Sequence, residues 1–574
     1  MPQPKPILAR NIFLAGLVSA ALAGCATLPP ASRQGSADEE IQILALNDFH
    51  GNLVAPTAAT TWHDRNGQQE ERLGGVAQLG AMLGMLRADR EHTITVAAGD
   101  LIGASPLESA YFLDEPAIMA LNAIGLELAA VGNHEFDRGT AELRRIQHGG
   151  CEQHTSREPC LLDRPFVGAR FSYLAANVLD ERDEPLFSGT AIRDFGPVRV
   201  GFIGITLKDT ATLVAPAGTA GYRFADEAAT ANKLTQELRS AGADTVVLLI
   251  HQGGRVDPFF NADGCPALSG PIVPILDDLD PAISLVVSGH THAAYICERP
   301  TRDGSPRLLT SAGRYGNFVT DIRLRLDAPT GRVIEVDAVN LPVREVGGRQ
   351  ADVASLVERY VEASTPVAAR VIGRIEGALE PRRGDTDYAL ANLVADAQLA
   401  QTAGTDAGGA EIAFINTGGL RGQLVPAADG SVTYGQLFAL QPFGNTLVTL
   451  ELTGDQIRRV LEQQFTDDRP ANLRQSLLVP SAGLQISYDR NSPVGSRITA
   501  ITLDGSPLDP AVAYVVTVNN FLASGGDGFS ILAEGKMVVD GGLDLDALEA
   551  FIENGVQVPP LGRIVDVTSP AETY

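Results

Sequence analysis

Several polar side chains follow one another directly after an apolar run, at a point where an ordinary turn needs none of them. The stretch VGNHEFD spans 131–137, and the apolar run LELAAV leads into it at 126–131. A solvated turn has no need of a histidine between an amide and two carboxylates, whereas a metal or phosphate site uses all three kinds of group. We therefore expect this stretch to take part in chemistry.

The same arrangement recurs at the ends of other predicted strands. Imidazole or carboxylate groups follow each of these apolar runs: Asp48 and His50 in NDFH, Asp100 in GD, His251, and His290 and His292 in GHTH. Loops at the carboxyl ends of strands in α/β sheets converge on one crevice, so these groups are expected to meet. A lone histidine is more often solvated, and no role is assigned to the remaining ones, His63, His92, His148 and His154.

The collected donors are typical of a site for two metal ions. They are Asp48, His50, Asp100, Asn133, His251, His290 and His292, and thiolates are not among them. Such a set suits Mn, Zn, Fe or Mg. It is too large for one ion, but two ions about 3.5–4 Å apart that share one carboxylate would use every donor. Each motif alone is weak evidence, whereas the ordered set after successive strands is strong evidence.

The ordered run D-x-H, GD, GNHE, H and GHTH resembles the calcineurin-like metallophosphatases. The resemblance implies one ion held by Asp48, His50, Asp100 and His292, and a second held by Asp100, Asn133, His251 and His290, with Asp100 bridging. It also implies that His134 faces the phosphoryl group as charge stabiliser or proton donor and that Asp137 orients its imidazole, whereas Glu135 is expected to be structural. Metal-bound hydroxide would then attack the phosphorus in line.

Motifs in the second half narrow the resemblance to the 5′-nucleotidase family, across nearly the whole mature chain. They are NTGGLR at 416–421, QPFGNTL at 441–447 and NFLASGGDGFS at 520–530. The resemblance implies a base sandwiched by Phe443 and Phe521, ribose hydroxyls on Asp527, phosphate on Arg421 and the base edge at Asn445. Each phenylalanine alone would fit a packed core, but the flanking glycine and polar residues favour loops.

One stretch departs from the family pattern. Thr386 stands where relatives often carry a further arginine, and Arg382 or Arg383 is a candidate to replace it. The exact phosphate and substrate preference is therefore left open by the sequence.

Alternating apolar runs and amphipathic segments predict the elements that position these residues. The predicted strands of the first half are 41–46, 93–98, 126–131, 198–205, 245–250 and 283–288, and helices are predicted at 74–90 and 227–242. This rhythm indicates an α/β (α+β) fold with partly parallel sheets. A helix at 351–371, interrupted near Pro366, is expected to connect to a second pattern with a helix at 390–400 and strands at 411–416 and 514–519.

These elements predict a domain organisation. By the family resemblance, a two-sheet metallophosphatase sandwich with flanking helices covers 41–343, a linking helix covers 344–371, and an α/β nucleotide-binding domain covers 372–574.

The N-terminus predicts export. Lys5 and Arg10 precede a short apolar region at 11–24, which is shorter than the about 20 residues that a spanning helix needs. LAGC at 22–25 resembles a bacterial lipobox, with 1–24 as signal peptide, Cys25 as the lipidated residue and 25–40 as a flexible tether. A plain secretory signal is the alternative. We expect a protein on the periplasmic or cell-surface face, in contact with the membrane through this anchor only.

Charge and cysteine content limit the partners and the compartment. The net charge of −26 argues against nucleic-acid polymers as partners, which require basic surfaces. Cys151, Cys160, Cys265 and Cys297 form an even set without a CxxC pair, as expected for disulfides in an oxidising compartment. Among three possible connectivities we expect the two local bridges, Cys151–Cys160 and Cys265–Cys297.

Together these observations predict a lipid-anchored two-metal 5′-nucleotidase that takes part in nucleotide catabolism. A UDP-sugar or nucleotide diphosphatase and a 2′,3′-cyclic-nucleotide phosphodiesterase are alternatives on the same scaffold. Cyclic-nucleotide members of the family tend to carry tyrosines at the stacking positions, and the two phenylalanines favour the nucleotidase. A nucleotide-binding lipoprotein without turnover would be expected to have lost ligands, and a sulfur-compound hydrolase fits the base-stacking motifs poorly.

Overall fold

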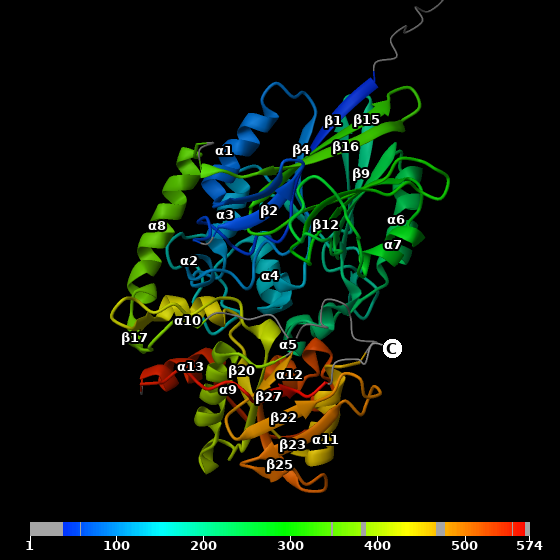
Figure 1. Cartoon of the computed structure of the whole chain (residues 1–574). Coiled ribbons are helices and arrows are strands. Elements are labelled where there is room, and N and C mark those ends of the chain that lie inside the picture. The colour runs from blue at the N-terminus through cyan, green and yellow to red at the C-terminus, as the bar shows by residue number, and fades with distance from the viewer. Residues whose placement is uncertain are drawn as a thin grey trace, which may run out of the picture. The chain divides into compact units, whose positions relative to one another are not determined.

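A computed structural model describes residues 38–568 except 58, 346–347, 380–385, 467–476 and 554 (Figure 1). The predicted signal peptide, the tether up to residue 37, Cys25, Arg382 and Arg383 lie outside the described residues. Among the residues that are described, no helix combines the length and the apolar character needed to cross a membrane.

Two sheets form the framework of the first half. The first has the order β16-β15-β1-β4-β5-β6. Its strands are β1 (Asp38–Leu46), β4 (Thr93–Ala97), β5 (Leu128–Ala130), β6 (Ser172–Leu174), β15 (Phe318–Asp327) and β16 (Arg332–Pro342). The strands β1, β4, β5 and β6 pair in parallel, and β15 and β16 are antiparallel additions at one side.

The second sheet has the order β13-β14-β12-β11-β9-β8. Its strands are β8 (Thr190–Phe195), β9 (Val198–Thr206), β11 (Thr245–His251), β12 (Ile283–Ser288), β13 (Ala294–Glu298) and β14 (Leu308–Ala312). The pairs β9–β11, β11–β12 and β12–β14 are parallel. The carboxyl ends of β9, β11, β12 and β14 therefore lie at one edge of this sheet.

Alternation along each strand places side chains in two different cores. Ile43 of β1 belongs to the core between the sheets, together with Val200 of β9 and Val247 of β11. The next residue, Leu44, packs instead with helices α1 (Val76–Arg87) and α3 (Glu115–Ala123). Helices α6 (Glu227–Ser240) and α7 (Ile272–Asp278) cover the outer face of the second sheet (Figure 1). Burial on both faces explains the continuous apolar runs in the sequence.

The first half contains further helices and strands. They are β2 (Thr60–Asp64), β3 (Gly67–Glu71), α2 (Leu107–Ala110), α4 (Gly139–His148), β7 (Val178–Leu179), α5 (Pro216–Thr219) and β10 (Arg223–Phe224), and the 3-10 helices His134–Phe136 and Lys208–Thr212.

Helix α8 (Ala351–Ala368) connects the two halves. It contacts α1, α2 and α3 of the first half and α10 (Tyr434–Leu440) of the second. We expected an interruption near Pro366, but the helix continues through that residue and ends at Ala368. Proline removes one backbone hydrogen bond, and because it stands in the last turn, the helix ends soon after it without a break.

The second half has its own core and sheets. One sheet has the order β21-β18-β25-β20-β26, from β18 (Ile412–Asn416), β20 (Thr446–Thr453), β21 (Leu478–Pro480), β25 (Ala513–Asn519) and β26 (Lys536–Leu543). Another has the order β24-β23-β22-β27, from β22 (Leu484–Tyr488), β23 (Ile498–Leu503), β24 (Ser506–Pro507) and β27 (Ile564–Asp566). The strands β17 (Val371–Arg374) and β19 (Ser431–Thr433) pair with each other.

The α-helices of the second half are α9 (Ala389–Thr402), α10, α11 (Gly454–Gln463), α12 (Asn520–Ala523) and α13 (Asp544–Glu553). The predicted α/β fold class is confirmed.

The first strand extends further than the sequence predicts. It begins at Asp38 rather than Ile41, so that the last residues assigned to the tether are paired with β15. Their side chains are charged, which hid the strand, but Glu40 lies 3.6 Å from Arg323 and Asp38 lies 3.9 Å from Arg325 on the partner strand. Opposite charges across a strand pair stabilise an exposed strand end.

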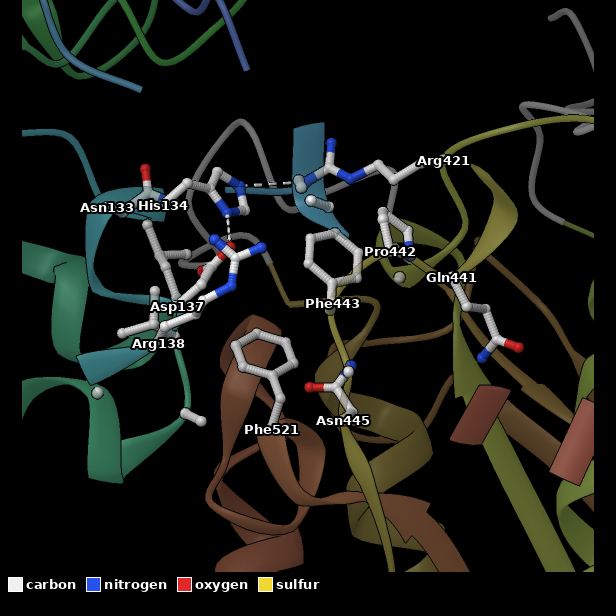
Figure 2. A pocket seen from close by; sticks show the side chains of 18 of the residues that line it. Asn133, His134, Asp137, Arg138, Arg421, Gln441, Pro442, Phe443, Asn445 and Phe521 are labelled. Carbon is white, nitrogen blue, oxygen red and sulfur yellow. Dashed lines mark hydrogen bonds and ion pairs between the residues drawn. The ribbon is translucent and has the colours of Figure 1, made fainter. Parts of the chain in front are cut away.

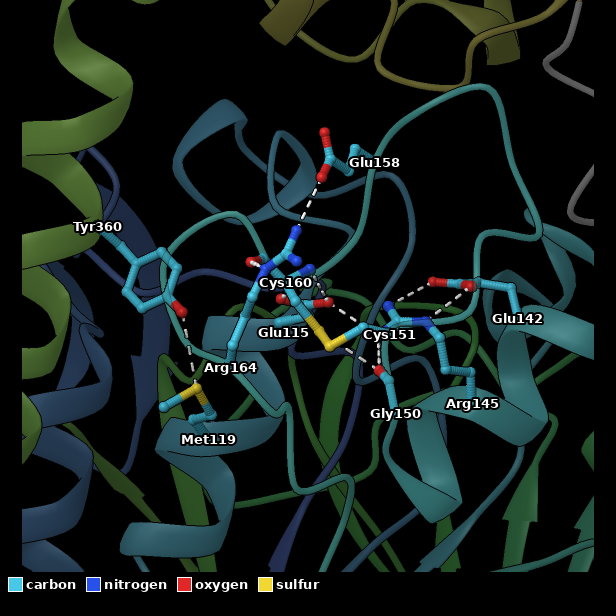
Figure 3. The surroundings of a disulfide bond; sticks show 10 residues. All are labelled: Glu115, Met119, Glu142, Arg145, Gly150, Cys151, Glu158, Cys160, Arg164 and Tyr360. Atoms are coloured by element: carbon cyan, nitrogen blue, oxygen red, sulfur yellow. Dashed lines mark hydrogen bonds and ion pairs between the residues drawn. A yellow bond between two sulfur atoms is a disulfide. The ribbon is translucent and has the colours of Figure 1, made fainter.

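Both predicted disulfides are present. Cys151 bonds to Cys160, and Cys265 bonds to Cys297. The first bond closes a loop after α4 whose base is held by Glu115, since the backbone N–H of Cys160 donates to that carboxylate at 2.9 Å (Figure 3). The buried Arg145 lies 2.8 Å from the same carboxylate. The predicted connectivity is therefore confirmed.

Candidate active site

The seven predicted ligands come together where the carboxyl ends of the two sheets meet. Asp48 and His50 follow β1, Asp100 follows β4, Asn133 follows β5, His251 ends β11, and His290 and His292 follow β12. The two sheets are joined here by direct contacts. The backbone N–H of His290 donates to the Asp48 carboxylate at 3.0 Å, and His251 Nδ1 lies 2.8 Å from the carbonyl oxygen of Ala98.

The donor atoms form two groups that share Asp100. In one group, His50 Nε2 lies 3.1 Å from His292 Nε2, and His292 Nε2 lies 3.4 Å from Asp48 Oδ1. In the other, Asn133 Oδ1 lies 3.1 Å from His251 Nε2 and 3.0 Å from His290 Nδ1. Asp100 Oδ2 is 3.6 Å from His50 Nε2 and 3.0 Å from His251 Nε2. Its carboxylate therefore stands between the groups, where a bridging ligand belongs.

The electrostatics of these groups suit divalent cations. Burial lowers the pKa of His50 and of His290 to about 3, so that both imidazoles are neutral, as metal ligation requires. Burial also lowers the pKa of His251, but the charge of Asp100 outweighs it and raises the value to about 9. Burial raises the pKa of Asp48 to about 7. Buried carboxylates thus favour positive charge at this position, and the residues fit a pair of divalent ions.

The backbone of the ligand loops is held in an uncommon conformation. Asp48, His50, Asp100, His290 and His292 have φ between 48° and 71°. Residues other than glycine pay about 1–3 kcal/mol each for this left-handed conformation, and such strain concentrates at functional sites. Gly132 explains part of the GNH motif, because a Cβ at this position would lie 2.2 Å from Asp100 Oδ1.

His134 and Asp137 form a hydrogen-bonded pair beside the ligands. His134 Nδ1 lies 2.8 Å from Asp137 Oδ2, and the His134 and His50 rings are 5.1 Å apart. Burial lowers the pKa of His134, but the carboxylates of Asp137 and Asp100 together raise it above its ordinary value. His134 Nε2 lies 3.5 Å from Arg421 Nη2 of the second half, which places both groups at one spot (Figure 2).

Glu135 braces the ligand loops, as its expected structural role requires. Its carboxylate accepts hydrogen bonds from the backbone N–H groups of Asp100 at 3.0 Å, Leu101 at 2.7 Å and Gly132 at 2.6 Å. The loops after β4 and β5 are thereby held together.

A cavity of about 850 Å³ joins the ligand groups to the second half. Phe443, Phe521, Asn445, Asp527 and Arg421 all line it, together with His134 and His292. Figure 2 shows Phe443, Phe521, Asn445, Arg421 and His134 among these residues. The Phe443 ring stacks on His134 with centroids 5.8 Å apart, and the Arg421 guanidinium lies 5.0 Å from the centre of the Phe443 ring. Asp527 accepts a hydrogen bond from Asn416 Nδ2 at 2.8 Å. The side chain of Asn445 forms a hydrogen bond with that of Asp544.

Other residues that line the cavity belong to no recognisable motif, and the sequence did not predict a role for them. His154 and Arg157 of the Cys151–Cys160 loop line it, and Arg157 lies between Tyr111 of the first half and Phe438 of the second, at 5.8 and 5.6 Å from their ring centres. Arg314, in the loop after β14, lines it as well. A single arginine in a loop has no periodicity or spacing that marks it in a sequence.

The chain matches two family models, one for each half. Calcineurin-like phosphoesterase matches residues 41–294, and the 5′-nucleotidase C-terminal domain matches residues 371–534.

Curated relatives and a solved structure match both halves together. Endonuclease YhcR of Bacillus subtilis is 28% identical over 96% of this chain, which spans 42% of that protein's length. Cell wall protein Lmo0130 of Listeria monocytogenes is 29% identical over 93% of this chain and 69% of its own. The crystal structure of a 5′-nucleotidase precursor from Thermus thermophilus superposes with a TM-score of 0.73 and 25% identity, over 93% of this chain and 100% of that one.

Proposed function

Because the chain belongs to the family of metal-dependent phosphoester hydrolases that joins a calcineurin-like phosphoesterase domain to a 5′-nucleotidase C-terminal domain, we propose that it is a 5′-nucleotidase. It would convert nucleoside 5′-monophosphates and water to nucleoside and phosphate. The observation that carries this proposal is that one cavity is lined by four of the predicted metal ligands, by Arg421 and by the two phenylalanines. We assign the metal domain to 41–343, the linker to 344–371 and the nucleotide-binding domain to 372–574.

We assign the metal ligands as two sets. Asp48, His50, Asp100 and His292 would hold one divalent ion, and Asp100, Asn133, His251 and His290 the other. Two of the three clusters of donors support these sets, and the third joins His134 to His50 and Asp100. When bound, such ions supply charge neutralisation at phosphoryl oxygens and acidify water for the attack. Zn and Mn both suit these donors.

The chain's own residues carry the other steps. Arg421 presents a planar fork of donors to phosphoryl oxygens, close to where His134 lies. Protonated His134 gives its proton to the leaving 5′ oxygen, and Asp137 keeps the imidazole oriented through the 2.8 Å contact at Nδ1. Asp527 would bind the ribose hydroxyls, and Asn445 would reach the base edge after exchanging its bond to Asp544.

Replacing either cavity phenylalanine by alanine tests base recognition. Phe443→Ala and Phe521→Ala should each lower kcat/KM for AMP by about ten- to a hundred-fold, since stacking is worth about 1–3 kcal/mol per base. Hydrolysis of p-nitrophenyl phosphate should fall much less, because this substrate has no nucleobase.

A matched control separates stacking from packing. Phe551 is a half-buried phenylalanine of the second half that does not line the cavity, so Phe551→Ala should leave the ratio of the two activities unchanged. If the cavity variants lower both activities equally and lower the melting temperature, the phenylalanines are core residues and the base sandwich is rejected.

A phosphodiesterase activity is the second candidate, and the name of the Bacillus relative, an endonuclease, favours testing it. UDP-sugar or nucleotide diphosphatase and 2′,3′-cyclic-nucleotide phosphodiesterase activities need the same metal ligands. Chromatographic identification of the products formed from AMP, UDP-glucose, ATP and 2′,3′-cyclic AMP with added Mn, Zn or Co distinguishes these activities, because cleavage of UDP-glucose or of the cyclic nucleotide releases no orthophosphate. Turnover of UDP-glucose or the cyclic nucleotide without turnover of AMP would replace the proposed function.

We also propose export and lipid anchoring through Cys25. The LAGC sequence at 22–25 supports it, and a relative is named as a cell wall protein. Cys25→Ser should move the protein from the membrane fraction to the soluble fraction, because the cysteine thiol carries the lipid. Fractionation of cells that express either form measures this, and an unchanged distribution would show that Cys25 is not the anchor.

A further inference from the structure

Arg314 is a guanidinium in the wall of the active-site cavity to which no motif gives a role. It follows the carboxyl end of β14, the strand next to β12 in the second sheet. The carboxyl end of β12 leads to His290 and His292, so Arg314 extends from the same edge of the sheet as these predicted ligands. Its position in the fold is that of a site residue.

The loop that carries Arg314 is fixed to the metal-ligand loop after β1. Asn47 Nδ2 donates to the carbonyl oxygen of Gly313 at 2.7 Å, and the backbone N–H of Tyr315 donates to the carbonyl oxygen of Asp48 at 2.7 Å. Gly313 and Tyr315 both have positive φ, at 78° and 57°. A strained and doubly anchored loop holds its side chain in one place, as a binding site requires.

The guanidinium of Arg314 is positioned by rings and carries no carboxylate partner among the described residues. It lies 4.8 Å from the centre of the Tyr315 ring and 5.6 Å from that of Phe260. Its Nε is buried and makes no hydrogen bond within the described part of the chain. In contrast, Arg138 of the same cavity is paired with Asp114. A preorganised cation that lines a cavity is suited to an anionic ligand.

The surroundings indicate which anion this is. The Tyr315 ring under Arg314 lies 5.6 Å from the ring of His292 and 5.9 Å from that of His50. Arg421 of the second half lies 3.5 Å from His134, whose ring is next to that of His50. We propose that Arg314 binds an oxygen of the phosphoryl group that is transferred, as a first-half counterpart of Arg421. This inference rests on the proposed function and names a further residue for its substrate.

The position beside His292 and His50 favours the phosphoryl group over the rest of the substrate. Phe443, Phe521 and Asp527, the residues assigned to the nucleoside, all belong to the second half, whereas Arg314 belongs to the half that holds the metal ligands. An arginine fork can meet two phosphoryl oxygens at once. Arg314 would also compensate for Thr386, which stands where the family often has another arginine.

The test compares Arg314→Gln and Arg314→Lys with a matched control. Arg344 also lies over an aromatic ring of the first half, 5.7 Å from the centre of Trp62, but its Nε is paired with Glu71 at 2.8 Å and it does not line the cavity. Each variant of the full chain is loaded with Mn²⁺. The measurements are metal content, kcat/KM for AMP and p-nitrophenyl phosphate, and orthophosphate affinity by calorimetry.

Arg314→Gln should weaken orthophosphate binding and lower kcat/KM for both substrates by about ten- to a hundred-fold, as expected for a lost charge-assisted hydrogen bond. The metal content should not change. Arg314→Lys should recover part of the loss, because lysine restores the charge but not the fork. Arg344→Gln should match the wild type.

Other results would overturn the inference. They are an unchanged orthophosphate affinity in Arg314→Gln, an unchanged kcat/KM for both substrates, or a loss of metal. Calorimetry measures the contribution of Arg314 to orthophosphate binding and does not require catalytic turnover. A wild-type protein that binds orthophosphate through Arg314 but hydrolyses no ester would therefore reject the proposed function and keep the inference.

Discussion

Asp100→Asn is expected to remove at least one of the two metal ions and nearly all turnover. The Asp100 carboxylate stands between the two groups of donors, 3.0 Å from His251 Nε2 and 3.6 Å from His50 Nε2. The amide keeps the shape but loses the charge that both groups share. Mutation of a residue that hydrogen-bonds to a metal ligand lowers metal affinity or activity by about 10- to 100-fold. Mutation of a ligand that both ions share should lower them further. Elemental analysis and AMP hydrolysis measure the two effects.

A control is needed for the effect of replacing any buried carboxylate by an amide, apart from the loss of a metal ligand. Asp321 is also buried in the first half, where it pairs with Arg323 and accepts a hydrogen bond from Gln42, away from the ligands. Asp321→Asn is expected to affect stability but to keep both ions and the activity per folded molecule. Two bound ions per chain in the Asp100 variant would reject the bridging role.

His134→Asn is expected to keep both ions and to lower kcat by about 10²- to 10⁴-fold, the usual contribution of a general acid. In the structure His134 pairs with Asp137, and the raised pKa of its imidazole favours the protonated form near neutral pH. Metal analysis separates this variant from Asp100→Asn, because Asp100 is a proposed metal ligand and His134 is not, so only the Asp100 variant should lose metal. Loss of metal from the His134 variant would assign this residue to the ligands instead.

The pH profile gives a second readout for the same residue. Burial lowers the pKa of His134, and the charges of Asp137 and Asp100 raise it by more. Asp137→Asn removes one of these charges, so the pKa should fall and the proton should be lost at lower pH. The alkaline limb of kcat/KM for AMP should therefore move to lower pH in Asp137→Asn and disappear in His134→Asn. An alkaline limb that is the same in all three proteins would exclude His134 as the proton donor.

The sequence identified the parts of the site that depend on local patterns. Each of the buried strands β1, β4, β5, β11 and β12 is a short apolar run, and the polar residue that follows it is visible without any long-range information. The parallel arrangement then brings these ends together by geometry. The resemblance to the 5′-nucleotidase family is confirmed by the matches to both halves.

The parts that escaped prediction depend on contacts between distant segments. Arg157 is held in place by a disulfide loop and two rings from different halves, and Arg314 by a loop bonded to residues 47 and 48. Asp38 and Glu40 look like tether residues until their partners on β15 are known. Such features come from tertiary structure, which overrides local sequence preference.

The place of β1 in its sheet sets an order on how the chain can fold. This strand lies between β15 and β4, and Ile43 pairs with Ile322 on one side and Ile94 on the other. One neighbour is thus synthesised soon after β1, and the other only after most of the first half. Pairings this distant in sequence form slowly, because loop closure must precede the contacts that reward it. The loop with Asp48 and His50, which leads out of β1, should therefore acquire its final geometry in a late step. Pulsed hydrogen exchange during refolding would show this as late protection of the β1 amides that pair with β15, and early protection there would contradict it.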